Sequence, residues 1–186
     1  MDLLVSFATP FLRFFKKLVH LGEIEKFKSA LRRNPHDHYL RTRFAKYCLQ
    51  QYFHDESSSK IHAAEAVRQF ETIPQSEVTD LEVYYLMGKY FQGKDDRKAA
   101  EIYRQGVKRY NEFSGKSSEF KREGAETAFA LVINLLKLET NPSDPEMEKF
   151  FQNIRKSSLM SFLGHKLDFN HPLAANLSPA SQASAG

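Results

Sequence analysis

The sequence predicts an all-α fold in which about eight helices form stacked antiparallel hairpins. Apolar residues recur at helical spacing along most of the chain. No segment shows the sustained two-residue alternation that is typical of a half-buried strand. The eight glycines and seven prolines stand mainly between the periodic stretches. This distribution favours long helices with short turns over a many-turned β-sandwich.

The N-terminal part of the chain contains four predicted helices, at about residues 10–22, 23–33, 37–53 and 60–72. Thr9-Pro10 is a typical helix start, because threonine caps free N–H groups and proline at the first helical position loses no hydrogen bond. Gly22 is expected to end the first helix. Pro35 and Pro74 are expected to end the second and the fourth, since proline cannot continue a helix.

Four more helices are predicted at about residues 79–92, 96–110, 118–138 and 143–162. Thr79-x-x-Glu82 reads as a capping box, and Ser143, followed by acidic residues and a proline, reads as another helix start. Residues 128–133 are hydrophobic all round, so we expect this stretch to be buried on several sides. Together the helices predict one domain over residues 1–165. The uncharged, Ala- and Ser-rich end predicts a disordered tail over residues 166–186.

One hairpin, residues 81–110, combines small and aromatic residues in a recognisable order, namely Tyr84, Met87-Gly88, Phe91, Ala99, Tyr103 and Gly106. We expect the small residues to lie where two helices approach closely, and the aromatic residues to fill the gaps. The order resembles the tetratricopeptide repeat (TPR), a 34-residue helix–turn–helix unit. Residues 37–73 resemble it more loosely, through Phe44-Ala45, Cys48, Ala66 and Phe70. The resemblance implies a solenoid of stacked hairpins that binds protein without catalysis.

In the tetratricopeptide family, the first helices of successive hairpins line a concave groove. The resemblance therefore implies equivalent groove positions at Lys46 and Lys89. The residues expected near them are Tyr39, Thr42, Tyr85 and Gln92. Two lysines in one groove favour an acidic or carboxylate-bearing peptide segment as the partner. The expected function is that of a scaffold or adaptor, and chaperone-like binding is one version of it.

The positive charge is concentrated at the N-terminal end, which suggests an alternative function. Residues 1–50 contain ten Lys/Arg and four Asp/Glu, net +6, whereas residues 51–186 contain seventeen and nineteen, net −2. A basic patch includes Arg32, Arg33, Arg41 and Arg43. It follows a Phe-rich amphipathic stretch, so the chain could bind an anionic membrane surface. The other interpretations are that these phenylalanines pack on the first hairpin or bind a partner.

The sequence predicts no catalytic or metal-binding motif. The chain has no Gly-rich phosphate loop and no serine elbow. The best metal-like cluster, His36-Asp37-His38, is better explained by Asp37 as a helix cap, because side chains two apart do not share a helix face. We therefore expect no enzyme activity, metal or cofactor. Nucleic-acid binding is not expected either, since the aromatic residues near the basic patch sit on apolar faces.

The cysteine content and the lack of long apolar runs favour a cytoplasmic protein. Cys48 is the only cysteine, so no internal disulfide can form, and its helical context predicts a packed small hydrophobe. No run reaches the ~18–20 apolar residues of a membrane-spanning helix. The N-terminal residues lack the basic leader and the cleavage pattern of a secretory signal.

Overall fold

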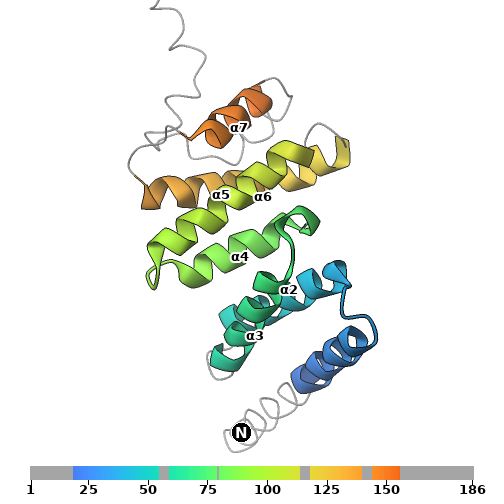
Figure 1. The fold of residues 1–186 in the computed structure, drawn as a ribbon. Helices are drawn as coiled ribbons and strands as arrows, with labels where there is room; N and C mark the ends of the chain where they lie inside the picture. Colours follow the sequence, from blue (N-terminus) through green and yellow to red (C-terminus); the bar gives the residue numbers. More distant parts are fainter. Residues whose placement is uncertain (1–18, 55–58, 79, 114–117, 140–143, 156–186) are drawn as a thin grey trace, which may run out of the picture. The chain divides into compact units, whose positions relative to one another are not determined.

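The structure, a computed structural model, describes residues 19–54, 59–78, 80–113, 118–139 and 144–155. Every regular element in these ranges is helical, which confirms the all-α prediction (Figure 1). The chain divides into two compact units, Met1–Val78 and Thr79–Gly186. The expected domain over residues 1–165 stays a prediction, and the expected tail lies outside the described residues.

The first unit contains a helix over residues 19–33, helix α2 (His38–His54), helix α3 (Ser59–Thr72) and a short 3₁₀ helix (Gln75–Glu77). The helix over residues 19–33 passes through Gly22, so the predicted helix end at this glycine is wrong. An exposed helical glycine costs only about 1 kcal/mol relative to alanine, and no proline or polar cap follows it. The predicted helix start at Thr9-Pro10 lies outside the described residues.

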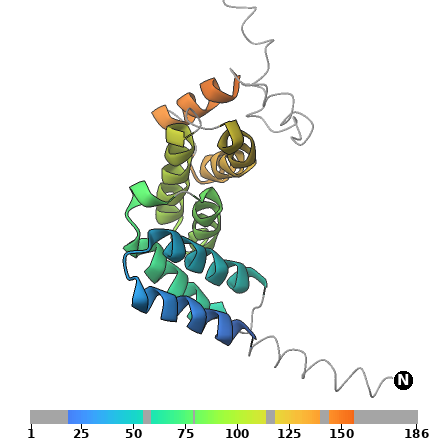
Figure 2. The same ribbon diagram turned by 90° about the vertical axis from the view of Figure 1, so that its right-hand side faces the viewer.

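Aromatic stacking joins the first helix of this unit to α2. The Phe27 and Phe44 rings stack with centroids 4.9 Å apart and planes at 10°. Helices α2 and α3 pack against each other (Figure 2). Their buried residues include Phe44, Ala45, Cys48, Ala66 and Phe70. Cys48 is fully buried, which confirms it as a packed small side chain. Burial raises the pKa of its thiol to about 12, so it stays protonated at neutral pH.

The second unit contains α4 (Leu81–Phe91), α5 (Asp96–Phe113), α6 (Ser118–Leu138) and α7 (Pro145–Arg155). Helix α5 packs against the other three, and α4 also contacts α6 (Figure 1). Helix α5 is three residues longer than predicted. Within the apolar run of residues 128–133, three positions are buried and three are half-buried. The predicted extension of the last helix to residue 162 lies outside the described residues.

Aspartates cap α4 and α7 in the described chain. Asp80 accepts the backbone N–H of Glu82 at 2.9 Å, and Asp144 accepts that of Glu146 at 2.9 Å. Each cap therefore lies one residue after the predicted one, because the carboxylate of aspartate is an equally good acceptor and stands closer to the first helical turn. Asp37 caps α2 as predicted, by accepting the Leu40 N–H at 2.8 Å.

Small residues allow close helix contacts in the second unit. A methyl group added at Gly88 would overlap the ring of Tyr103, which belongs to α5. A methyl group added at Gly106 would lie 2.7 Å from Leu131 Cδ1 and 2.9 Å from Tyr84 Cβ. Tyr84 and Tyr103 are fully buried, and burial raises the pKa of both phenols. The predicted pairing of small and aromatic residues at close helix contacts is therefore confirmed at these positions.

Candidate functional site

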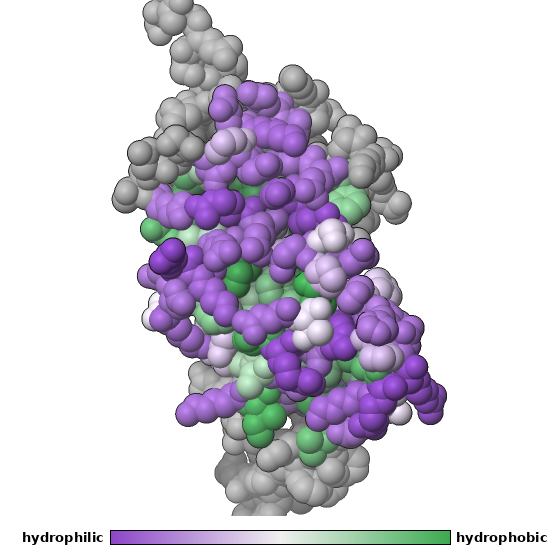
Figure 3. Space-filling model, viewed as in Figure 1, coloured by the Kyte–Doolittle hydropathy of each residue, from purple (hydrophilic) through white to green (hydrophobic). Residues whose placement is uncertain are grey.

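Hydrophilic side chains predominate on the face drawn in Figure 3, with smaller hydrophobic areas between them. In the first unit, α2 presents such a mixed surface through Tyr39, Arg43 and Lys46. These residues recur at helical spacing and therefore lie on one face. Tyr39 is 66% exposed, and Arg43 Cζ lies 5.9 Å from the centroid of its ring. Lys46 is half-buried.

Thr42 does not belong to this accessible surface. Its side chain is buried, and its hydroxyl donates a hydrogen bond of 2.8 Å to the carbonyl of His38. A threonine hydroxyl bonded to the preceding turn of its own helix does not need an external partner. The expectation that Thr42 lines the groove is therefore wrong, because the residue faces the interior of the unit.

In the second unit, α4 presents Tyr85 and Lys89 one helical turn apart. Lys89 is exposed, and its Nζ lies 5.6 Å from the centroid of the Tyr85 ring. Gln92 has a different role, because its Oε1 accepts the Tyr103 hydroxyl at 3.1 Å and its backbone N–H donates to Gly88 O at 2.9 Å. Gln92 therefore holds the end of α4 onto α5.

Each unit thus brings a cation close to a tyrosine on an accessible helix face. The pairs are Tyr39 with Arg43 on α2 and Tyr85 with Lys89 on α4. Lys46 belongs to the first unit and Lys89 to the second, so the groove that they were expected to share stays a prediction.

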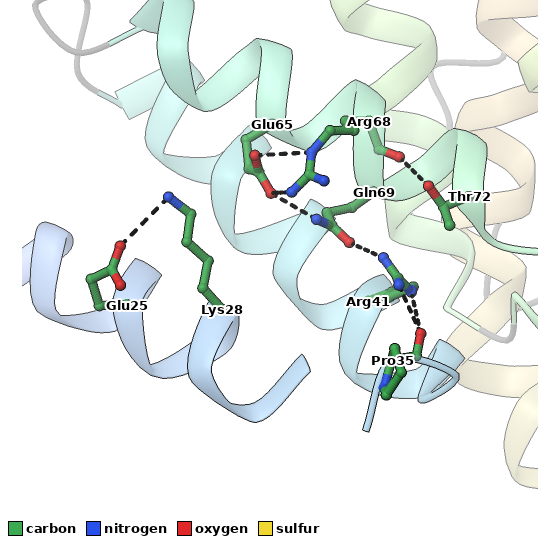
Figure 4. Close-up of polar contacts among 8 residues, drawn as sticks. All are labelled: Glu25, Lys28, Pro35, Arg41, Glu65, Arg68, Gln69 and Thr72. Atoms are coloured by element: carbon green, nitrogen blue, oxygen red, sulfur yellow. Dashed lines mark hydrogen bonds and ion pairs between the residues drawn. The ribbon is translucent and has the colours of Figure 1, made fainter. Parts of the chain in front are cut away.

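Arg41, one of the residues of the predicted basic patch, makes hydrogen bonds within the first unit. Its Nη1 donates to Gln69 Oε1 at 2.7 Å, and its Nε and Nη2 donate to the carbonyl of Pro35 at 3.2 and 2.7 Å (Figure 4). The guanidinium therefore ties the start of α2 to α3. Arg41 is half-buried, and its place in the basic patch stays a prediction.

The other predicted arginines of the patch are exposed. Arg32 Nη2 lies 3.9 Å from Glu25 Oε2. Lys28 Nζ lies 3.5 Å from Oε1 of the same carboxylate, and Figure 4 shows this second contact. Arg33 is exposed, and Arg43 lies beside the Tyr39 ring. Glu25 therefore neutralises part of the positive charge that the sequence concentrates in this region.

A polar network continues from Arg41 along α3. Gln69 Nε2 donates to Glu65 Oε1 at 2.7 Å, and Arg68 Nη2 donates to the same oxygen at 2.6 Å (Figure 4). Burial raises the pKa of the Glu65 carboxyl, but the hydrogen bonds from Arg68 and Gln69 outweigh it and hold the pKa below its ordinary value. Glu65 stays ionised at neutral pH, and the network acts as an internal brace between α2 and α3.

A second aromatic and basic group, which was not predicted from the sequence, lies at the end of α4. The Tyr90 and Phe91 rings meet edge to face with centroids 5.0 Å apart. Lys94 Nζ lies 3.6 Å from the Tyr90 centroid, and Lys98 Nζ lies 4.3 Å from that of Phe91. The signal for this group in the sequence was the adjacent aromatic pair, with lysines three and seven residues after Phe91. Only the turn geometry shows that each lysine reaches a ring.

The described part of the chain offers no metal-binding cluster and no helix that could cross a membrane. No group of three His, Cys, Asp or Glu residues in it could hold a metal ion. None of its helices is long and apolar enough for a bilayer. Asp37, the centre of the His36-Asp37-His38 cluster, is engaged as the cap of α2.

Comparison of the chain with models of known protein families, with curated proteins and with solved structures found no match. The tetratricopeptide resemblance therefore depends on the residues of the two hairpins at 37–73 and 81–110. It stays a prediction.

Proposed function

We propose that this chain is a non-catalytic adaptor or scaffold of the TPR type that binds a peptide segment of a partner protein. The observation that carries the proposal is the repeated placement of a cation beside a tyrosine on an accessible helix face. Arg43 lies 5.9 Å from the Tyr39 centroid, and Lys89 lies 5.6 Å from the Tyr85 centroid. Such pairs combine apolar contact area with a charged donor that can bind a carboxylate.

Each pair of a tyrosine and a cation covers only a small area, which is compatible with binding a peptide along one helix face. A peptide lying along α2 or α4 would meet side chains at one-turn intervals, as in other helix and groove interfaces. Tyrosine contributes a large contact area with little conformational freedom to lose, which favours its use at interfaces. The pairing of a ring and a cation favours a partner that carries carboxylates next to apolar side chains.

The proposal predicts that the double substitution Lys46→Glu and Lys89→Glu weakens partner binding at least tenfold. The reason is that two attractive charges become repulsive toward an acidic segment. The partner is first identified by affinity capture from the native cell with mass spectrometry. Binding of the purified partner is then measured by pull-down and titration, and circular dichroism checks that helicity is unchanged.

The matched control is Lys108→Glu with Lys137→Glu, which changes the net charge equally at two exposed positions of α5 and α6. The control is expected to lower affinity less than twofold. Unchanged partner binding by the Lys46 and Lys89 double variant would contradict the proposal that the partner binds on these faces of α2 and α4.

A second candidate function is peripheral membrane binding through the N-terminal segment. Val19 and Leu21, in the helix over residues 19–33, are 58% and 51% exposed. The Phe-rich residues 7–15 precede this helix in the sequence and lie outside the described residues. Exposed apolar side chains beside exposed cations are typical of a surface that rests on anionic lipid.

For this candidate, the full chain is expected to bind vesicles that contain phosphatidylserine, and a variant lacking residues 1–20 is expected to lose that binding. Co-sedimentation measures both, with phosphatidylcholine vesicles as the uncharged control. Binding should fall as salt is added, because surface charges are screened. Equal binding by the two proteins, or none by either, would contradict membrane association.

A further inference from the structure

The turn between α4 and α5 carries a compact group of two aromatic rings and two lysines, Tyr90, Phe91, Lys94 and Lys98, here named the turn cluster. Both rings are half-buried, and Lys94 is exposed. The two rings meet edge to face and together form one continuous apolar surface. An ammonium group stands over each ring, at 3.6 Å for Tyr90 and 4.3 Å for Phe91.

The backbone of the turn is fixed by local hydrogen bonds. Gly93 adopts a φ of 80°, a left-handed conformation that favours glycine. The N–H groups of Lys94 and Asp95 both donate to the carbonyl of Phe91 at 2.8 Å. The two lysines therefore project from a defined backbone, so that less conformational freedom is lost when a ligand binds.

The turn has an excess of positive charge. Residues 90–98 contain three cations (Lys94, Arg97 and Lys98) and two acids, which gives a net charge of +1. Both acids have structural roles, since Asp95 accepts the Lys98 N–H at 2.9 Å and Asp96 accepts the Gly93 N–H at 2.7 Å. These bonds cap α5 and close the turn. The charge of the turn therefore complements an anionic ligand.

We propose that the turn cluster binds an acidic peptide segment in which carboxylates alternate with apolar side chains. The ammonium groups would receive the carboxylates, and the rings would contact the apolar side chains. A single-stranded nucleic acid is a different class of partner, and the test below counts its tighter binding against the proposal. The inference rests on the proposed function in taking the partner to be a protein, but it uses a surface other than the Tyr39 and Tyr85 faces.

The test measures binding of a fluorescein-labelled Glu/Leu peptide of about twelve residues to the full chain by fluorescence anisotropy. Lys94→Gln with Lys98→Gln is expected to weaken binding about tenfold, because both charges are removed while most of each side chain remains. Tyr90→Leu is expected to weaken it about threefold at unchanged charge, because the ring beneath Lys94 is lost. The matched control, Lys108→Gln with Lys137→Gln, is expected to change the affinity less than twofold.

Several outcomes would overturn the inference. Equal losses in the two lysine pairs would show a response to net charge alone. Tighter binding of an oligothymidylate of matched length would make the surface a nucleic-acid site. Absence of peptide binding by the unsubstituted chain would also overturn the inference. The proposed function would not fall with it, because that function is tested separately by affinity capture of the partner. If Lys46→Glu with Lys89→Glu abolished peptide binding and the turn variants did not, the proposed function would be supported and the turn cluster rejected.

Discussion

Replacing Phe44 with alanine is expected to lower the free energy of unfolding of the first unit by about 3–5 kcal/mol. Phe44 is fully buried in α2, and its ring stacks on Phe27 with centroids 4.9 Å apart. The substitution removes the stacking contact with Phe27 and leaves a cavity at a fully buried position of α2. The helix over residues 19–33 should then pack less tightly against α2. Urea unfolding followed by circular dichroism measures the loss.

Phe53→Ala is the matched control on the same helix. Phe53 is 40% exposed, so its truncation creates little cavity and should cost less than about 1 kcal/mol. Equal losses for Phe44→Ala and Phe53→Ala would contradict the stacked core of the first unit. A small loss for both would mean that the first helix is held mainly by other contacts, such as the 2.7 Å hydrogen bond between His20 Nδ1 and the Tyr47 hydroxyl.

The substitution Gly88→Ala is expected to destabilise the second unit by about 1–3 kcal/mol, although alanine is the better helix former. The added methyl group would overlap the ring of Tyr103, which is fully buried and is held at its hydroxyl by Gln92. An aromatic ring fixed at both ends cannot move aside without shifting α5 away from α4. Urea unfolding followed by circular dichroism measures the change.

The same substitution at Gly22 should raise the free energy of unfolding instead of lowering it. A methyl group there meets nothing within 4 Å, so Gly22→Ala should stabilise the helix by up to about 1 kcal/mol.

A double-mutant cycle with Tyr103→Leu tests whether the Tyr103 ring causes the loss of stability in Gly88→Ala. Gly88→Ala should cost less once the ring is gone. Stabilisation by Gly88→Ala, or an unchanged cost in the Tyr103→Leu background, would contradict the close contact between α4 and α5.

The helices could be predicted because their signals are local. The apolar spacing and the turn residues placed α2 to α7 within a few residues of their positions in the described chain. Gly22 misled the prediction, because a single glycine ends a helix only when the following residues also leave the helical path. The caps were shifted by one residue, since Asp80 and Asp144 stand beside the expected Thr79 and Ser143 and accept the same kind of bond.

The surface was harder to predict, because it depends on contacts between residues far apart in the sequence. Arg41 was taken for an external cation, yet it bonds to Gln69, 28 residues later. The burial of Thr42 could not be separated from the exposure of Tyr39 without knowing which face of α2 meets its neighbours. The turn cluster depends on the path of Gly93, which brings Lys98 back over Phe91.

The buried thiol of the first unit also makes that unit separately observable. Cys48 is the only cysteine of the chain, it is fully buried, and its raised pKa keeps it protonated. Thiol reagents attack the thiolate, so modification in native conditions has to wait until α2 opens. The rate of alkylation therefore reports the free energy of opening around position 48. The chain carries its own probe for deciding whether a ligand or a vesicle stabilises its N-terminal unit.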